Sequence, residues 1–350
     1  MALLLAGLSG CAEIGYYWQA ASGHLSILRK KQSVEELLTH PDTPPALTEK
    51  LRLVQEVQRF AHQELRLPER AGYTGYVDLQ RPYVTVVVTA AQPLALKSYR
   101  WCYWFIGCQE YRGYFLEQDA LDYARQMQQE QPLDVSIGYV SAYSTLGWLS
   151  GRFIPDYFSD PLLNTFLDQD NEEIIATLIH EIAHQVVYVP NDTPFNESFA
   201  VFVEQEGVRR FLDRHEGSGS ITLQRYLEKR TDRELFRQLI SSALEELKDA
   251  YAKASSDTER LQAKERILKQ LKRTYASRRE EFRVLSYERW FSRDLNHAHL
   301  LGVSRYQNQV PIFARLFEEQ GREWSPFYER VREIAQLPET ERNRLLEILQ

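Results

Sequence analysis

The sequence has few cysteines, no excess of basic residues, no internal repeat and no low-complexity linker. Its formal net charge of −7 argues against a general nucleic-acid binder, because phosphate contacts need a concentrated basic face. It contains no nucleophile-elbow string, which argues against a serine hydrolase of that type. What it does have is a globular composition, 43% hydrophobic and 26% charged over 350 residues, which can bury a sizeable core in one or two domains.

The most informative segment is the pentad His180-Glu181-Ile182-Ala183-His184. At about 100° per residue, the two histidines project from one flank of a helix with Glu181 beside them. Two imidazoles can then hold one zinc ion, and the carboxylate can act as a base toward water. Apolar residues occupy the opposite flank, so the helix has one face for the core and one for a cleft. A helix that carries these three residues by chance is the alternative.

A second helical pattern opens after the turn-forming residues 188–194. A hairpin of the two helices would bring Glu197 back to the histidines, and catalytic zinc takes three protein ligands with one position left for water. We therefore expect one Zn²⁺ ion, held by His180, His184 and Glu197. Glu204 lies two helical turns after Glu197 and could accept the free ring N–H of a ligating histidine. A solvated helix carboxylate is the alternative for Glu204.

The two segments, H-E-x-x-H and N-E-x-x-A beginning at Asn196, resemble the gluzincin metallopeptidases, and Glu204 matches an acidic residue of their aminopeptidase branch. The whole chain more closely resembles the bacterial predicted-aminopeptidase lipoproteins, also along residues 111–115, 142–148 and 296–306. The resemblance implies a zincin-like fold and a zinc-dependent aminopeptidase acting on peptides in the cell envelope. The G-x-M-E-N strand by which large gluzincin aminopeptidases bind the substrate α-amine is absent. A zinc endopeptidase, a cell-wall amidase and a non-catalytic metal-bearing lipoprotein therefore stay open.

Cys11 follows Leu8-Ser9-Gly10, which looks like the lipobox of bacterial lipoproteins, whose cysteine is lipidated. The apolar stretch at residues 2–8 is too short to span a bilayer, which needs about 20 residues, and it fits a signal h-region. No Lys or Arg precedes it, so a plain hydrophobic tail is the alternative. We expect a leader at residues 1–11 and a lipid anchor that holds the protein on the outer membrane, facing the periplasm.

The other two cysteines, Cys102 and Cys108, lie close together in an aromatic segment. An exported protein permits a disulfide between them, and two buried free thiols are the alternative. A metal site is the least favoured reading, because no nearby His or Cys completes it.

The remaining pattern predicts an α+β protein that is mostly helical, with a small mixed sheet. We expect strands at residues 84–89 and 135–141 and helices at residues 16–29, 45–65 and 116–129. Residues 223–281 are rich in helix formers and charges and predict a long helical hairpin, which could dimerise, gate substrate or pack on its own domain. We expect a catalytic core at residues 12–218 and a helical C-terminal part at residues 219–350. The oligomeric state is not predicted.

Two further site features are expected. Residues 140–145, which include Tyr143, are the candidate edge strand for pairing with an extended peptide substrate, with an ordinary buried strand as the alternative. Zinc peptidases also need a donor for the developing carbonyl oxyanion. Tyr306 is the first candidate because the corresponding tyrosine of gluzincin aminopeptidases lies downstream; Tyr143, His297 and Tyr188 are the others.

Overall fold

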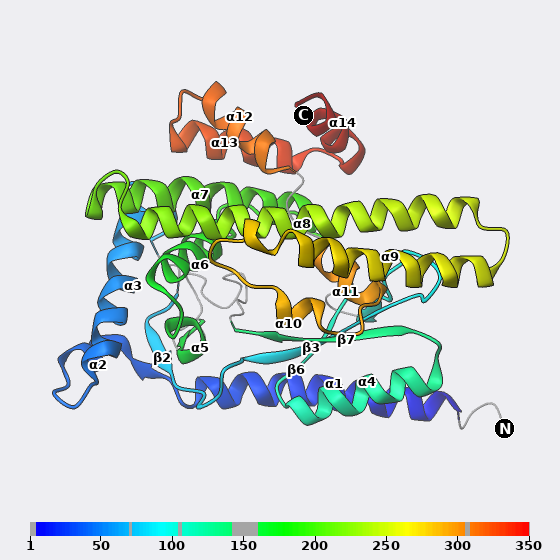
Figure 1. Ribbon diagram of the computed structural model, residues 1–350. Helices are drawn as coiled ribbons and strands as arrows, with labels where there is room; N and C mark the ends of the chain where they lie inside the picture. Colours follow the sequence, from blue (N-terminus) through cyan, green and yellow to red (C-terminus); the bar gives the residue numbers. More distant parts are fainter. Residues whose placement is uncertain (1–4, 70–71, 104–106, 142–159, 305–308, 350) are drawn as a thin grey trace. The chain divides into compact units, whose positions relative to one another are not determined.

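The computed structural model describes residues 5–69, 72–103, 107–141, 160–304 and 309–349, and for residues 5–14 and 304 it describes the backbone alone. These residues are mostly helical, with short strands in small sheets (Figure 1). This composition is compatible with the predicted α+β class. In the described ranges, no helix is both long and apolar enough to cross a membrane.

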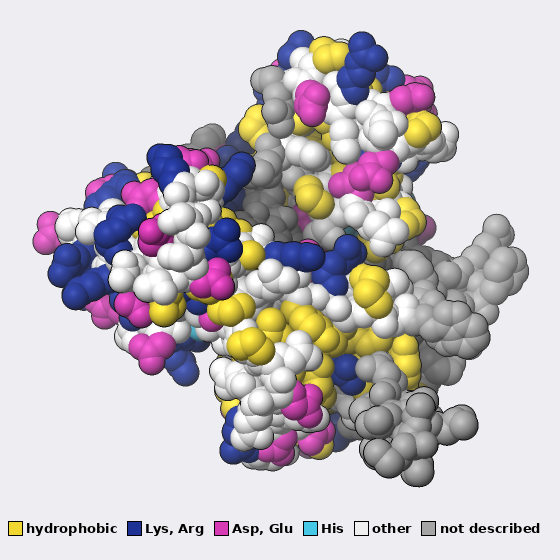
Figure 2. Space-filling model, turned by 90° about the vertical axis from the view of Figure 1, so that its right-hand side faces the viewer, with side chains coloured by type: hydrophobic (Ala, Val, Ile, Leu, Met, Phe, Trp, Pro, Cys, Tyr) yellow, Lys and Arg dark blue, Asp and Glu magenta, His cyan; other side chains and the backbone are white. Residues whose placement is uncertain are grey.

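The chain divides into two compact units, and each unit combines segments that are far apart in the sequence. Unit 1 consists of Met1–Lys30, Leu79–Tyr143 and Glu228–Ser304, and unit 2 consists of Lys31–Asp78, Ser144–Leu227 and Arg305–Gln350. The predicted domain ranges are contiguous instead, and they stay a prediction. On the face shown in Figure 2, basic and acidic side chains are intermixed rather than gathered by sign.

Unit 1 contains an antiparallel sheet in the order β6-β3-β7, with strands β3 (Thr85–Ala91), β6 (Arg112–Tyr114) and β7 (Asp134–Val140). Val86 and Val88 are fully buried on one face of β3, as alternation along a strand requires. Helix α4 (Glu117–Glu130) packs on that face, and helix α1 (Leu5–Leu28) contacts β6. A hairpin of β4 (Trp101–Tyr103) and β5 (Gly107–Gln109) completes this part.

The other part of unit 1 is the long helical hairpin. Helices α8 (Ile221–Lys253) and α9 (Asp257–Ser277) run side by side, and α8 begins in unit 2 (Figure 1). Ser256 caps α9 by accepting a hydrogen bond from the Glu259 amide, and Glu259 accepts in return from the Ser255 amide. The short elements η2 (Arg279–Glu281), α10 (Glu288–Phe291) and α11 (His297–Ser304) follow, and apolar side chains of α10 and α11 join the core between the two long helices. The hairpin is therefore packed within its own unit.

Unit 2 is a helical core with a small mixed sheet in the order β1-β2-β8, antiparallel at β1–β2 and parallel at β2–β8. Its elements are β1 (Gln32–Ser33), α2 (Val34–Thr39), α3 (Pro45–Gln63), β2 (Gly75–Val77), β8 (Leu162–Leu163), α5 (Asn164–Leu167), α6 (Asn171–Ala183), α7 (Thr193–Glu216), α12 (Val310–Glu319), α13 (Trp324–Gln336) and α14 (Glu339–Leu349). Helices α6 and α7 lie against each other, and phenylalanines from α7, α12 and α13 stack around Phe199 and Phe202. Such close packing makes α6 and α7 a rigid platform.

Gly207 sets how closely α7 approaches its neighbours. A Cβ at this position would lie 2.8 Å from Leu65 Cδ1 and 3.0 Å from Ile179 Cγ2, both on fully buried side chains. Ile179 belongs to α6, one residue before the first histidine of the pentad. Glycine is therefore required here by space, and it holds α7 against the helix that carries the histidines.

Candidate metal centre

Helix α6 presents the two histidines at its C-terminal end. Its Ile174, Ile175, Leu178, Ile179 and Ile182 are all buried, so the helix is held by one apolar flank. The helix ends at Ala183, and His184 is its C-cap, with the His184 amide donating to the His180 carbonyl. The two imidazoles thus sit one turn apart, with ring centroids 4.8 Å apart and planes at 84°.

A clamped turn brings α7 back to this end of α6. The buried Asn196 side chain accepts from the Val189 amide and donates to the Val189 carbonyl, each at 2.8 Å. Asp192 caps α7 by accepting from the Phe195 amide, and the buried Arg342 guanidinium donates to Asp192 at 2.8 Å. These bonds satisfy buried polar groups on both sides of the turn, so the position of the next residue, Glu197, is restrained.

The side chains of His180, His184 and Glu197 converge. Their candidate ligand atoms all lie within 4.8 Å of one another. His180 Nε2 is 3.2 Å from His184 Nε2 and 3.4 Å from Glu197 Oε2, and His184 Nε2 is 3.7 Å from Glu197 Oε1. In the described part of the chain this is the one such group of His, Cys, Asp and Glu side chains.

These separations fit a tetrahedral zinc ion. Zinc bonds of about 2.0–2.1 Å to nitrogen and oxygen, at tetrahedral angles, place neighbouring ligand atoms about 3.3–3.4 Å apart. The separations of His180 Nε2 from His184 Nε2 (3.2 Å) and from Glu197 Oε2 (3.4 Å) are close to that value. Two imidazole nitrogens and one carboxylate also form a donor set that zinc accepts, and they leave a coordination position for water or substrate.

Glu204, on α7, supports the first histidine. Its Oε2 accepts from His180 Nδ1 at 3.1 Å, and its Oε1 accepts from the Tyr226 hydroxyl at 3.1 Å. Because Nδ1 donates to Glu204, Nε2 of His180 faces the other two donors. A carboxylate partner on the far ring nitrogen orients a ligating histidine and increases its basicity. Tyr226 is itself 1% exposed, so Glu204 has little freedom to turn.

The electrostatics of the cluster favour one positive charge at its centre. Burial would lower the pKa of His180, but hydrogen bonds to Glu197 and Glu204 outweigh it and raise that pKa to about 10. Burial and the charge on His180 lower the pKa of His184 to about 4. Burial would raise the pKa of Glu197, but its hydrogen bond with His180 brings it below the usual range. Without metal, His184 and Glu197 already have the protonation states that a metal ligand needs, and only His180 must lose a proton.

The other predicted residues lie in several places. Glu181 is on α6 directly after His180, and Tyr188 is 43% exposed in the turn. His297 is fully buried in unit 1, where Nδ1 donates to the Gln92 carbonyl and Nε2 accepts from the Tyr251 hydroxyl. Both ring nitrogens are therefore occupied, which removes His297 from the candidate oxyanion donors.

Some of the predicted positions lie wholly or partly outside the described residues. Tyr306 and Tyr143 lie outside the described residues, and the edge strand at 140–145 is described only to its beginning, where β7 forms an edge of its sheet. Cys11 belongs to α1, of which the backbone alone is described there. Cys102 and Cys108 face each other across the β4–β5 hairpin and form a disulfide.

Sequence reasoning missed Tyr226 and the clamp made by Asn196. Tyr226 lies 22 residues after Glu204 on another helix, and no motif links the two. Asn196 stands inside the second motif, but its contact with Val189 depends on the fold of the turn. The short spacing between the motifs was the only signal that the turn must be tight.

Comparison with known proteins places this site in a family. No curated protein and no solved structure is significantly similar to the chain. A family model described as "Putative aminopeptidase" matches residues 15–346, which include α6, α7, Glu204 and Tyr226. Because the match extends over nearly the whole sequence, the chain belongs to this aminopeptidase family.

Proposed function

We propose that the protein is a zinc-dependent peptidase of the cell envelope that removes N-terminal residues from peptides. The observation that carries the proposal is the convergence of His180, His184 and Glu197 at separations suited to tetrahedral zinc. Membership of an aminopeptidase family supports the reaction class. The envelope location rests on the lipobox-like residues that precede Cys11.

In this proposal His180, His184 and Glu197 hold the metal, and Glu204 orients His180 through Nδ1. A bound zinc ion would supply Lewis-acid activation of water and of the peptide carbonyl. Glu181, next to the ligands, takes the proton of the attacking water and delivers it to the leaving amine. Tyr306 is the proposed hydrogen-bond donor to the carbonyl oxygen.

Metal analysis combined with a peptide-cleavage profile tests the proposal. Glu181→Gln should keep stoichiometric zinc and lose hydrolysis by about 10²-fold or more, because the base is gone and the ligands remain. His184→Ala and Glu197→Ala should lose both metal and activity. Glu216→Gln, the same change at an exposed residue of α7, is the control and should match the wild type. Full activity in Glu181→Gln would exclude Glu181 as the base.

A second comparison separates the reaction classes. Peptides with free and with acetylated N-termini, together with muropeptides, should be offered to the same preparation. Cleavage restricted to free N-termini supports an aminopeptidase. Cleavage of blocked peptides or of muropeptides would indicate an endopeptidase or an amidase, and stoichiometric zinc without turnover would indicate a non-catalytic metal protein.

A further inference from the structure

Helix α1 uses one face to pack on unit 1. The Tyr16 ring stacks on Tyr103 at 5.3 Å, and the Arg112 guanidinium lies 4.0 Å from the centre of the Tyr16 ring. Gln19 donates to the Gly113 carbonyl and accepts from the Phe115 amide. This face is closed by its own unit.

The opposite face of α1 carries large apolar side chains that nothing covers in the described part of the chain. Trp18 is 75% exposed and Leu25 is 42% exposed, and their spacing of seven residues puts them on the same flank. Tyr17, beside them, is 40% exposed. Single exposed apolar residues need no explanation, but a tryptophan and a leucine aligned on one helix form a patch that favours a partner.

The C-terminal end of this flank is basic. Arg29 and Lys30 are exposed there, and the helix carries one acidic residue, Glu13, four positions before Tyr17. Apolar residues 2–8 precede the flank, and the helical backbone runs from Leu5 to Leu28. An exposed tryptophan on an apolar flank and basic residues beside it are features of helices that lie on anionic membranes.

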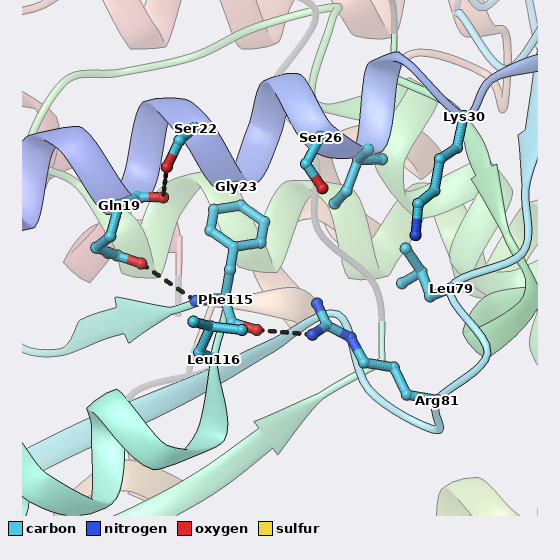
Figure 3. Close-up of a pocket in the computed structure, with 10 residues that line it drawn as sticks. Gln19, Ser22, Gly23, Ser26, Lys30, Leu79, Arg81, Phe115 and Leu116 are labelled. Carbon is cyan, nitrogen blue, oxygen red and sulfur yellow. Dashed lines mark hydrogen bonds between the residues drawn. The ribbon is translucent and has the colours of Figure 1, made fainter.

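A groove borders the same helix. It has a volume of about 260 Å³ and is lined on the α1 side by Gln19, Ser22, Gly23, Ser26, Ile27 and Lys30. Figure 3 shows Leu79, Arg81, Phe115 and Leu116 across from α1. The Arg81 guanidinium donates to the carbonyls of Tyr83, Val84 and Phe115, which hold it in place. Leu116, at the rim, is 59% exposed.

The composition of the groove matches a phospholipid headgroup. The Lys30 ammonium and two serine hydroxyls can receive a phosphate, and Leu79, Phe115 and Leu116 supply apolar wall for the start of an acyl chain. The groove and the exposed flank share α1, since Ser22 and Ser26 lie between Lys30 and the Trp18–Leu25 line around the helix. One planar lipid surface could therefore contact both.

We propose that the exposed flank of α1 and the adjoining groove bind the surface of an anionic phospholipid bilayer. Trp18 and Leu25 enter the interfacial layer, and Lys30 meets headgroup phosphate. This contact is separate from any acyl group on Cys11, and it does not depend on the metal centre. It would fix how unit 1 faces the membrane rather than merely tether it.

Vesicle co-sedimentation of the full chain tests the proposal, with Cys11→Ser in every variant so that no acyl group contributes. The protein that carries only Cys11→Ser should bind phosphatidylglycerol vesicles more tightly than phosphatidylcholine vesicles. Trp18→Ser combined with Leu25→Ser should weaken binding about tenfold or more, because apolar burial in the interface is lost. Ile221→Ser combined with Ile348→Ser changes two exposed apolar residues elsewhere, 83% and 68% exposed, and should have no effect.

A charge reversal supplies the second arm. Lys30→Glu should weaken binding to anionic vesicles about fivefold or more, since each surface cation contributes a comparable factor. Lys248→Glu, at an exposed lysine of α8, is the matched control. Equal binding by the α1 variants and their controls would overturn the proposal, as would equal binding to the two lipids. Peptidase assays on the same variants should be unchanged, which keeps this test independent of the proposed reaction.

Discussion

Single side chains in the metal centre are set by partners that are distant in sequence. Glu204 accepts from both His180 and Tyr226, so its carboxylate has one fixed orientation. The spacing of the first motif was sufficient to propose His180 and His184, because positions four apart on a helix share a flank, and Glu197 was proposed from the second motif and the expected helix hairpin. It could not reveal Tyr226, which reaches Glu204 from another helix.

Tyr226→Phe should reduce zinc affinity about threefold to tenfold, less than the 10–100-fold typical of a direct partner of a ligand, because Tyr226 acts through Glu204. Chelator competition measures the affinity. Tyr251→Phe is the matched control. It removes a tyrosine hydroxyl that contacts His297 in unit 1 and should leave zinc affinity unchanged. If both variants bind zinc like the wild type, Tyr226 has no positioning role.

The buried His297 and the half-buried His299 of unit 1 predict acid sensitivity. Burial and the nearby Arg293 lower the pKa of His299 to about 4, and burial also lowers the pKa of His297. The unfolded chain, with a histidine pKa near 6.5, therefore binds more protons in acid. The contribution of His297 and His299 to stability should therefore be constant above about pH 6.5 and fall as the pH drops from there toward about 4.

His299→Gln removes one of these groups. Urea unfolding between pH 7 and pH 4, followed in unit 1, should show a dependence on pH that is smaller by up to about 1.4 kcal/mol per pH unit. His215→Gln, at an exposed histidine of unit 2, is the control. An unchanged slope in His299→Gln would show that this ring is not the group that protonates on unfolding.

A glycine can allow a helix to pack closely against a neighbouring segment, and two helical glycines of this protein differ in whether they do so. Gly207 on α7 is enclosed by Leu65 and Ile179, whereas a Cβ at Gly302 on α11 would meet no atom of the described residues within 4 Å. Helix propensity does not distinguish the two glycines, because it favours alanine over glycine at either position. Their local sequences do not distinguish them, because the enclosing side chains come from other segments.

Gly207→Ala should destabilise the protein by about 1–3 kcal/mol through overpacking, in spite of the gain in helix propensity. Gly302→Ala should stabilise it by up to about 1 kcal/mol, because only the propensity changes. Urea or thermal unfolding of both variants measures the difference. Equal effects would mean that Leu65 and Ile179 move aside at no cost.

The chain as a whole combines two units that share helix α8 but have separate cores. The candidate metal ligands all belong to unit 2, on α6 and α7. A ligand that binds only the folded state stabilises the structure that holds it, by about 2.7 kcal/mol at a hundred times its dissociation constant. The stabilisation of the folded state by zinc should therefore be concentrated in unit 2.

Hydrogen exchange with and without a chelator tests this expectation. Zinc removal should speed amide exchange in α6 and α7 of unit 2, whereas β3 and α9 of unit 1 should change little. His184→Ala should exchange like the metal-free protein under both conditions. Uniform acceleration across both units would show that they unfold together, and no acceleration at all would contradict a structural contribution from the metal.

Local patterns in the sequence were enough to predict the helices at residues 16–29, 45–65 and 116–129, the two motif helices, the strands of the β3–β7 pair and the helical hairpin, because side-chain periodicity depends only on neighbours along the chain. The same holds for the three candidate ligands and for the aminopeptidase family, which follow from motif spacing and overall similarity. Folding was needed to pair Glu204 with Tyr226, to clamp Asn196 on Val189, to enclose Gly207 and to bury His297 against Gln92 and Tyr251. Folding was also needed to leave the side chains of Trp18 and Leu25 exposed on the surface. These contacts join segments up to some 200 residues apart, and no local pattern records which distant surfaces meet.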